Sequence, residues 1–119
     1  MRAWASGALA ALVIASPARA GESLTGEQIT SALSGRVTTG YQDSGSPYRI
    51  TYQADGTQTL QSGKFFDTGK WVVRGNQLCL TWNKKFSGQE QCYLVSRDGN
   101  TISYFHPDGS ASGTSKIEN

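Results

Sequence analysis

From Arg36 onward, apolar and polar residues alternate, and residue pairs typical of tight turns interrupt the alternation about every ten residues. Four such pairs are Asp55-Gly56, Gly75-Asn76, Asp98-Gly99 and Asp108-Gly109. Pairs of this kind favour two-residue hairpins, which join antiparallel strands that are neighbours in the sequence. The pattern predicts about eight strands in simple up-and-down order. The expected strands are 36–42, 48–54, 57–62, 70–74, 77–83, 89–97, 100–106 and 110–117.

Each predicted turn determines which residues face each other on neighbouring strands, so the registers can be checked for agreement. The expected partners are Val73 with Leu78, Trp71 with Leu80, Leu78 with Tyr93, Leu80 with Gln91, Val95 with Ile102 and Tyr93 with Tyr104. These registers gather apolar residues on one face, which holds Trp71, Val73, Leu78, Leu80, Trp82, Tyr93, Val95, Ile102 and Tyr104, joined by Tyr48, Ile50 and Tyr52. Closing such a sheet buries this face and removes the exposed edges. The expected fold is therefore all-β: an antiparallel meander of about eight strands, closed or curled into a small lipocalin-like barrel.

One short helix is predicted before the strands, over residues 25–34. Thr25 can cap its N-terminus, Gln28 completes a capping box, and Gly35 is a natural C-terminal stop. The helix has one apolar face, which is expected to flank or plug one end of the barrel. Residues 21–119 are thus predicted to form a single β-barrel domain with an N-terminal helix.

Residues 1–20 have the features of a secretory signal peptide. Arg2 supplies the positive start, residues 8–15 form an apolar run, and Ala18 and Ala20 are the small residues that signal peptidase needs. The apolar run is too short to span a bilayer comfortably, so no stable membrane anchor is expected. The protein is therefore predicted to be exported, to the periplasm or to the medium.

The balance of charge argues against two classes of partner. The whole chain carries a net charge of +2, but Arg2 and Arg19 lie in the predicted signal peptide, and without them nine basic residues balance nine acidic ones. Binding to nucleic acid or to anionic lipid depends on a basic surplus. Neither partner is therefore expected.

The chain has two cysteines, Cys79 and Cys92. In an oxidising compartment an even number of cysteines favours a disulfide, and the predicted hairpin places these two opposite each other on the outer face. A metal site would need more ligands than the single histidine, His106, and these cysteines provide. No metal and no cofactor are expected.

Several strand motifs resemble those of a family of short exported proteins from Gram-negative bacteria. They are a Gly-x-Trp strand at 69–73, a Leu-Cys strand at 76–82, a Cys-Tyr strand at 91–95, an Asp-Gly turn at 54–57 and the closing residues 116–119. The family is one of unknown function without established catalytic residues. The resemblance therefore supports the fold prediction and leaves the activity open.

The aromatic residues of the inward face are candidates for a ligand site. The candidate ligand-binding residues are Tyr48, Tyr52, Trp71, Trp82, Tyr104 and, at a strand end, His106. A pocket for a small apolar ligand in the barrel mouth is one interpretation. The other is that these rings fill the core, because a small eight-stranded barrel is just wide enough for side chains.

Two predicted loops place phenylalanine next to lysine, which suits a surface that binds another protein. The candidate interaction residues are Phe65, Phe66, Lys84, Lys85 and Phe86. The alternative is that the rings fold down onto one end of the barrel.

The leading functional hypothesis is an exported, periplasmic binding module that holds a small apolar ligand. The first alternative is a protein–protein interaction or inhibitor domain of the cell envelope, with another envelope protein as its partner. The second is a small hydrolase-like enzyme, in which His106 and Asp67 would be the participants. An enzyme is not expected, because the sequence shows no nucleophile motif and no paired acid and base.

Overall fold

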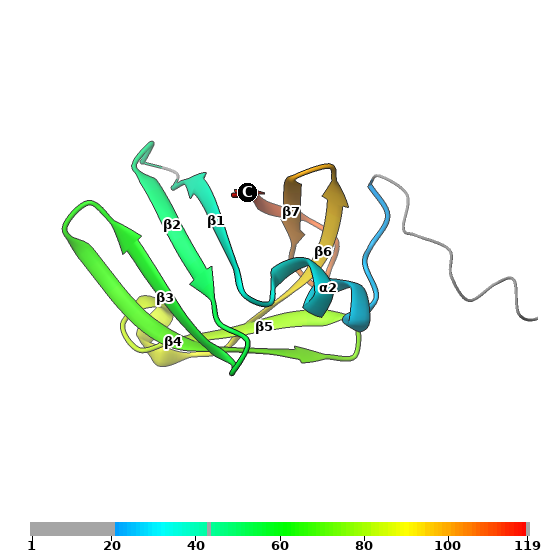
Figure 1. Cartoon of the computed structure of the whole chain (residues 1–119), viewed down its shortest axis with the longest axis horizontal. Coiled ribbons are helices and arrows are strands. Elements are labelled where there is room, and N and C mark those ends of the chain that lie inside the picture. The colour runs from blue at the N-terminus through cyan, green and yellow to red at the C-terminus, as the bar shows by residue number, and fades with distance from the viewer. Residues whose placement is uncertain (1–20, 43, 119) are drawn as a thin grey trace, which may run out of the picture.

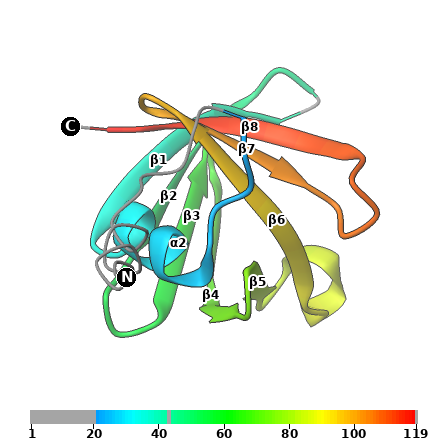
Figure 2. The same cartoon turned by 90° about the vertical axis from the view of Figure 1, so that its right-hand side faces the viewer.

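The computed structural model describes residues 21–42 and 44–118, and these form a closed antiparallel barrel with one α-helix (Figure 1). The elements are α2 (Gly26–Leu33), β1 (Arg36–Tyr41), β2 (Pro47–Tyr52), β3 (Thr57–Ser62), β4 (Phe65–Arg74), β5 (Gln77–Trp82), the 3-10 turn η1 (Lys85–Gly88), β6 (Gln91–Asp98), β7 (Thr101–Phe105) and β8 (Ala111–Ile117). Each strand pairs with the next one, and β8 pairs with β1 to close the barrel, as can be followed in Figure 2. The predicted eight-stranded barrel with a short N-terminal helix is confirmed. The predicted signal peptide, residues 1–20, lies outside the described residues.

The registers on both sides of β5 agree with the predicted ones. Trp71 faces Leu80 across β4 and β5, and Cys79 faces Cys92 across β5 and β6. The two cysteines form a disulfide on the outer face of the barrel, as expected. A disulfide in a domain of this size is compatible with an exported protein.

The predicted register between β6 and β7 is wrong by two residues. Val95 faces Tyr104 instead of Ile102, and Asp98 faces Thr101. The two turn residues are therefore Gly99 and Asn100 rather than Asp98 and Gly99. Gly99 has a φ of +61°, as the first central position of a type II′ turn requires. A shift of two residues leaves every side chain on its predicted face, so the apolar interior is unaffected.

The start of β4 corrects a second prediction. Residues 63–69 were expected to form a loop, but β4 begins at Phe65 and pairs with β3 along this whole stretch. Gly63 has a φ of +60° and makes a two-residue hairpin turn with Lys64. The strand was missed because Gly69, which weakens the strand pattern, interrupts it near its middle.

The turns at Asp55-Gly56 and Asp108-Gly109 also differ from the predicted two-residue turns. In each, the backbone closes over three residues, with bonds from Gln53 N to Thr57 O and from His106 N to Ser110 O. The glycine at the end of each loop has a φ above +90°. This is the three-residue hairpin in which a type I turn is followed by a left-handed glycine.

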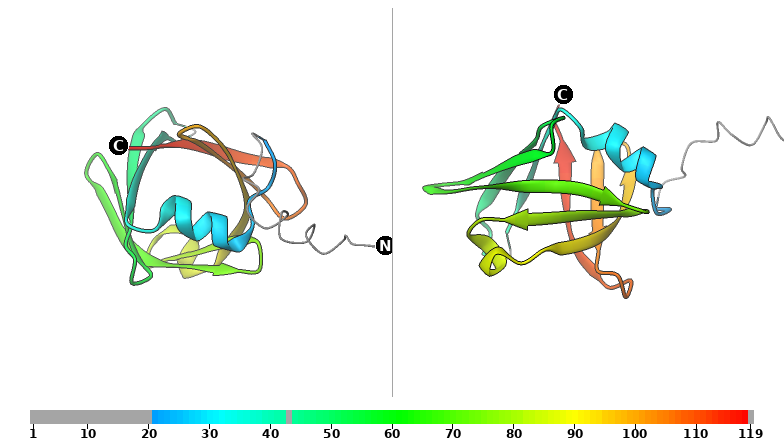
Figure 3. Two further views of the ribbon diagram at one scale, coloured as in Figure 1. Left: turned by 45° about the vertical axis from the view of Figure 1, so that its right-hand side comes forward. Right: turned by 90° about the horizontal axis from the view of Figure 1, so that it is seen from below.

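The two ends of the barrel differ, because α2 covers only one of them. Figure 3 shows α2 lying across one opening, while η1 and the four connections between β1 and β2, β3 and β4, β5 and β6, and β7 and β8 lie at the other. The apolar face of α2 is buried through Ile29, Ala32 and Leu33. The backbone N–H of Gly26 donates to Asn76 Oδ1 at 2.8 Å and ties the helix to the turn between β4 and β5. We call the end covered by α2 the helix end and the other the open end.

No helix in the described ranges, 21–42 and 44–118, is long and apolar enough to cross a bilayer.

Candidate functional site

A cavity of about 270 Å³ lies at the open end of the barrel. All five tyrosines of the chain line it, together with one tryptophan and one lysine. The residues around it are Tyr41, Gln42, Tyr48, Ile50, Tyr52, Leu60, Leu80, Trp82, Lys85, Tyr93, Tyr104, Ser112, Gly113 and Thr114. We call this space the tyrosine cavity.

The cavity is open on one side because Gly113, an inward position of β8 near the open end, carries no side chain. Gly113 faces the inward residue Tyr104 on β7. A Cβ atom added at Gly113 would meet no atom within 4 Å, so the space beside it is open. This side of the barrel therefore leaves unfilled the volume that larger side chains would occupy.

Tyr48 depends on Gly40 for its position. A Cβ atom at Gly40 would lie 2.6 Å from the Tyr48 hydroxyl, so only glycine leaves the ring where it is. From there the hydroxyl reaches the carbonyl oxygen of Thr114 on β8, at 3.4 Å. The ring thus crosses the inner surface of β1 and forms one wall of the cavity.

The deeper tyrosines are buried and held by hydrogen bonds. The Tyr104 hydroxyl lies 2.8 Å from Ser115 Oγ, and the side chain of Tyr52 also bonds to Tyr104. Burial raises the pKa of Tyr48 to about 12, with smaller contributions from neighbouring tyrosines. Burial also holds the pKa values of Tyr52, Tyr93 and Tyr104 above their ordinary range. The cavity wall is therefore built of neutral phenols, which offer apolar faces and a few polar tips.

Asp67 organises the loop that carries the lysine of the cavity. Its side chain is buried, with 1% exposed, and its carboxylate accepts the backbone N–H groups of Lys84 and Lys85 at 3.0 to 3.1 Å. It also accepts the N–H of Thr68 at 2.8 Å. Burial raises the pKa of Asp67, but these donors outweigh it, and the pKa lies below its ordinary value. An ionised carboxylate thus fixes η1 at the rim of the cavity.

Four of the six predicted ligand-binding residues line the cavity: Tyr48, Tyr52, Trp82 and Tyr104. Trp71 does not line it. Trp71 is buried, its Nε1 donates to the carbonyl oxygen of Gln53 at 2.8 Å, and its ring packs edge-on against Tyr52. His106 does not line it either, because it is exposed and its ring lies 6.0 Å from that of Tyr93. Trp71 is therefore a core residue, and His106 lies near the rim.

The other lining residues were not predicted as members of a ligand site. Ile50, Leu80 and Tyr93 were on the predicted inward face, so their alternation was an available signal. Gly113 and its neighbours Ser112 and Thr114 carried no such signal, because they are small or polar and do not continue the apolar alternation.

The five predicted interaction residues meet at one corner of the open end. Lys84 Nζ donates to the carbonyl oxygen of Phe66 at 2.8 Å and lies 5.7 Å from the ring centroid of Phe65. Lys85 Nζ lies 5.6 Å from the centroid of Phe86. The three phenylalanines remain 40 to 50% exposed instead of folding down onto the barrel. We call these five residues the lysine–phenylalanine patch.

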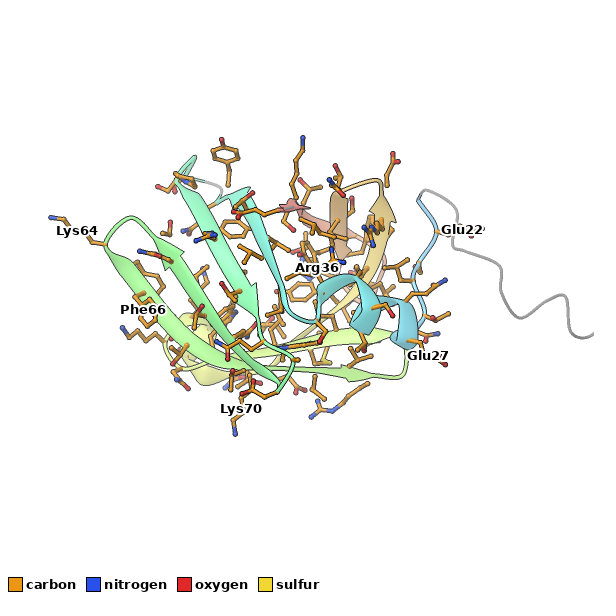
Figure 4. The ribbon with its side chains drawn as sticks, viewed as in Figure 1. Glu22, Glu27, Arg36, Lys64, Phe66 and Lys70 are labelled. Atoms are coloured by element: carbon orange, nitrogen blue, oxygen red, sulfur yellow. A yellow bond between two sulfur atoms is a disulfide. The ribbon has the colours of Figure 1, made fainter. Side chains whose placement is uncertain are left out.

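The shape of the patch comes partly from an unusual backbone. Phe86 and Ser87 have φ values of +56° and +53°, in the left-handed region that non-glycine residues seldom adopt. Such strain persists only where surrounding contacts hold the segment, and it is often found at functional sites. Figure 4 shows Lys64 extending from the neighbouring hairpin tip, and Phe66 on β4.

The described residues offer little for catalysis or metal binding. Asp67 is fully engaged by backbone donors, and no contact between Asp67 and His106 is present in the described part of the chain. Within the same residues, the one cluster with metal-ligand spacing is Cys79, Glu90 and Cys92. Its two sulfur atoms are bonded to each other, so neither is a free thiolate.

No family model matches this chain, and no curated protein matches it. The resemblance to short exported Gram-negative proteins stays a prediction.

Proposed function

We propose that the protein is an exported binding module that holds a small apolar ligand in the open mouth of its barrel. The observation that carries this proposal is the tyrosine cavity, an open space of about 270 Å³ walled by five tyrosines and Trp82. Ligand sites are typically concave and mostly apolar, with a few polar groups that orient the ligand. The cavity is concave and is lined by aromatic rings together with hydroxyl, amide and ammonium groups that can orient a ligand. Asp67 organises one side of its rim.

The size of the cavity limits the ligand. Its volume of about 270 Å³ lies just below the roughly 300–1,000 Å³ of sites for drug-sized ligands. A molecule of one or two rings, or a short chain, matches this volume.

Export is part of the same proposal. The features of residues 1–20 and the disulfide between Cys79 and Cys92 both support a periplasmic or secreted protein. The resemblance to exported Gram-negative proteins points in the same direction.

The test is native mass spectrometry of the protein purified from the periplasm of a Gram-negative host that expresses the full chain. We expect a reproducible extra mass that disappears on denaturation. The denatured mass should match a chain whose first residue is Gly21. The control is Gly113→Val, which places a side chain in the open space and should remove the extra mass. Equal native and denatured masses for the unmodified protein would contradict the ligand proposal.

The lysine–phenylalanine patch favours a second candidate function, an interaction or inhibitor domain of the envelope. Phe65 and Phe86 are exposed rings, each beside a lysine, and Phe66 is a third exposed ring nearby in the chain. Protein interfaces are rich in aromatic residues. The positive charge suits an acidic segment of another envelope protein.

Phe65→Ser combined with Phe86→Ser tests this second function. The matched control is Val72→Ser, because Val72 is 42% exposed on β4 but lies outside the patch. We expect a partner crosslinked to the protein in periplasm to be lost from the double variant, kept by the control, and weakened by added salt. A partner retained equally by all three proteins would exclude the patch as its binding surface.

A further inference from the structure

The tyrosine cavity has one charged side chain in its wall. Among the described residues that line it, Lys85 is the only ionisable group besides the tyrosines, and no aspartate or glutamate is present. The other lining residues are aromatic, aliphatic or uncharged and polar. Lys85 therefore brings the one formal charge among these lining residues.

Lys85 forms no ion pair with any carboxylate in the described ranges. The neighbouring carboxylate of Asp67 binds the backbone N–H of Lys85, and its charge is satisfied by backbone donors. The ammonium itself lies 5.6 Å from the ring centroid of Phe86, and the residue is half-buried. An unpaired cation in the wall of a concave, partly low-dielectric site attracts an anion more strongly than it would in open water.

The aromatic walls alone would also suit a different ligand. Tyrosine and tryptophan rings bind organic cations through their faces, and aromatic cages recognise quaternary ammonium groups. Such cages gain from the absence of other cations, whereas here Lys85 shares the space. Lys85 thus separates two ligand classes that the aromatic residues do not distinguish.

We infer that the ligand is a small aromatic molecule with one acidic group, bound with its rings among the tyrosines and its anion beside Lys85. This inference rests on the proposed function, and adds the chemical class of the ligand to it. Trp82 and Tyr93 provide aromatic surface for the rings. A ring system as large as naphthalene with a carboxylate is compatible with about 270 Å³.

The test compares three probes that share one ring system: 2-naphthoate, 2-naphthylmethanol and 2-naphthylmethylamine. Binding is followed by the fluorescence of Trp82, which lines the cavity, in a Trp71→Phe background that removes the other tryptophan of residues 21–119. We expect 2-naphthoate to bind most tightly and the amine most weakly. In Lys85→Gln the affinity for 2-naphthoate should fall about tenfold, since a charged hydrogen-bond partner is lost, while that for the alcohol stays within about twofold.

Lys84→Gln is the matched control. Lys84 is the adjacent residue and carries the same charge, but its ammonium is directed to the Phe66 carbonyl and does not line the cavity. This variant should bind 2-naphthoate as the unmodified protein does. An equal loss of affinity for 2-naphthoate in both lysine variants would show that only the net positive charge of the loop matters. That result would overturn the inference.

The remaining outcomes separate the inference from the proposal beneath it. If all three probes bind with equal affinity and Lys85→Gln changes nothing, the cavity is a ligand site without preference for anions. If none of the probes binds, the proposed function itself loses its support.

Discussion

The buried carboxylate of Asp67 on β4 accepts the backbone N–H of Lys85 at 3.0 Å, across 18 residues of sequence. This bond links the start of β4 to the 3-10 turn η1. It holds in place the residue that brings positive charge to the cavity, although the two lie on different hairpins.

Asp67→Asn tests this link. An asparagine amide cannot accept all the N–H groups that bind the carboxylate, and buried donors without partners are costly. We expect the free energy of unfolding to fall by about 2 kcal/mol, and the affinity for 2-naphthoate to fall with it as Lys85 loses its position. Chemical denaturation and fluorescence titration measure the two effects. Asp55→Asn, in an exposed turn, is the control, and an equal loss of stability there would contradict the special role of Asp67.

The lowered pKa of Asp67 also predicts a dependence on acid. A carboxylate whose pKa is lower in the folded state than in the unfolded chain contributes stability above the unfolded value, about 3.9. That contribution is lost as the pH falls from this value through the folded pKa. Urea midpoints between pH 6 and pH 2 should therefore converge for the unmodified protein and Asp67→Asn. A constant difference down to the lowest pH would show that the charge of Asp67 is not involved.

The tyrosine cavity predicts alkaline sensitivity. Burial raises the pKa of Tyr48 to about 12, whereas an unfolded tyrosine ionises near 10. Such a group stabilises the fold fully below about pH 10, and this contribution is lost as the pH rises through the folded value. Tyrosinate absorbance should thus rise in two stages, the later one together with loss of the barrel signal in circular dichroism. Complete ionisation near pH 10 with the barrel intact would contradict the buried position of these rings.

Gly113→Val should obstruct the cavity without unfolding the barrel. Its φ is not in the left-handed region, and a Cβ atom there meets nothing within 4 Å. Since glycine is unfavourable within a strand, valine should leave the protein equally stable or more stable by up to about 1 kcal/mol. Binding of 2-naphthoate should be abolished. Thr39→Val, on the outer face of β1, should bind normally, and unchanged binding in both variants would place the ligand elsewhere.

The disulfide between Cys79 and Cys92 is expected to support stability rather than the fold itself. It closes a loop with a sequence separation of 13, for which loop-closure entropy predicts about 3 kcal/mol. Reduction, or the double substitution Cys79→Ala with Cys92→Ala, should lower the melting temperature and keep the β-sheet spectrum. An unchanged melting curve would mean that the bridge is absent in solution.

Much of this fold could be predicted because its determinants are local. Turn residues lie between strands that are neighbours in the sequence, and alternation with period two assigns each side chain to a face. The pairing of Trp71 with Leu80 and of Cys79 with Cys92 was therefore correct to the residue. Local signals also explain the wrong register between β6 and β7. Gly99 can form a two-residue turn with Asp98 or with Asn100, and the two turns give registers that differ by two residues.

The site depended on the tertiary structure, because it is built by residues that only the closed barrel brings together. Tyr48 on β2 reaches Thr114 on β8 only because β8 pairs with β1, and the open space beside Gly113 has no signature in the sequence. Likewise, Lys85 reaches the cavity because Asp67 binds its backbone from another hairpin. The sequence by itself determined the strands, the inward face and the disulfide, through short-range turns and alternation. The tertiary structure decided which inward volume stays empty and which charge faces it, because both depend on contacts between distant parts of the chain.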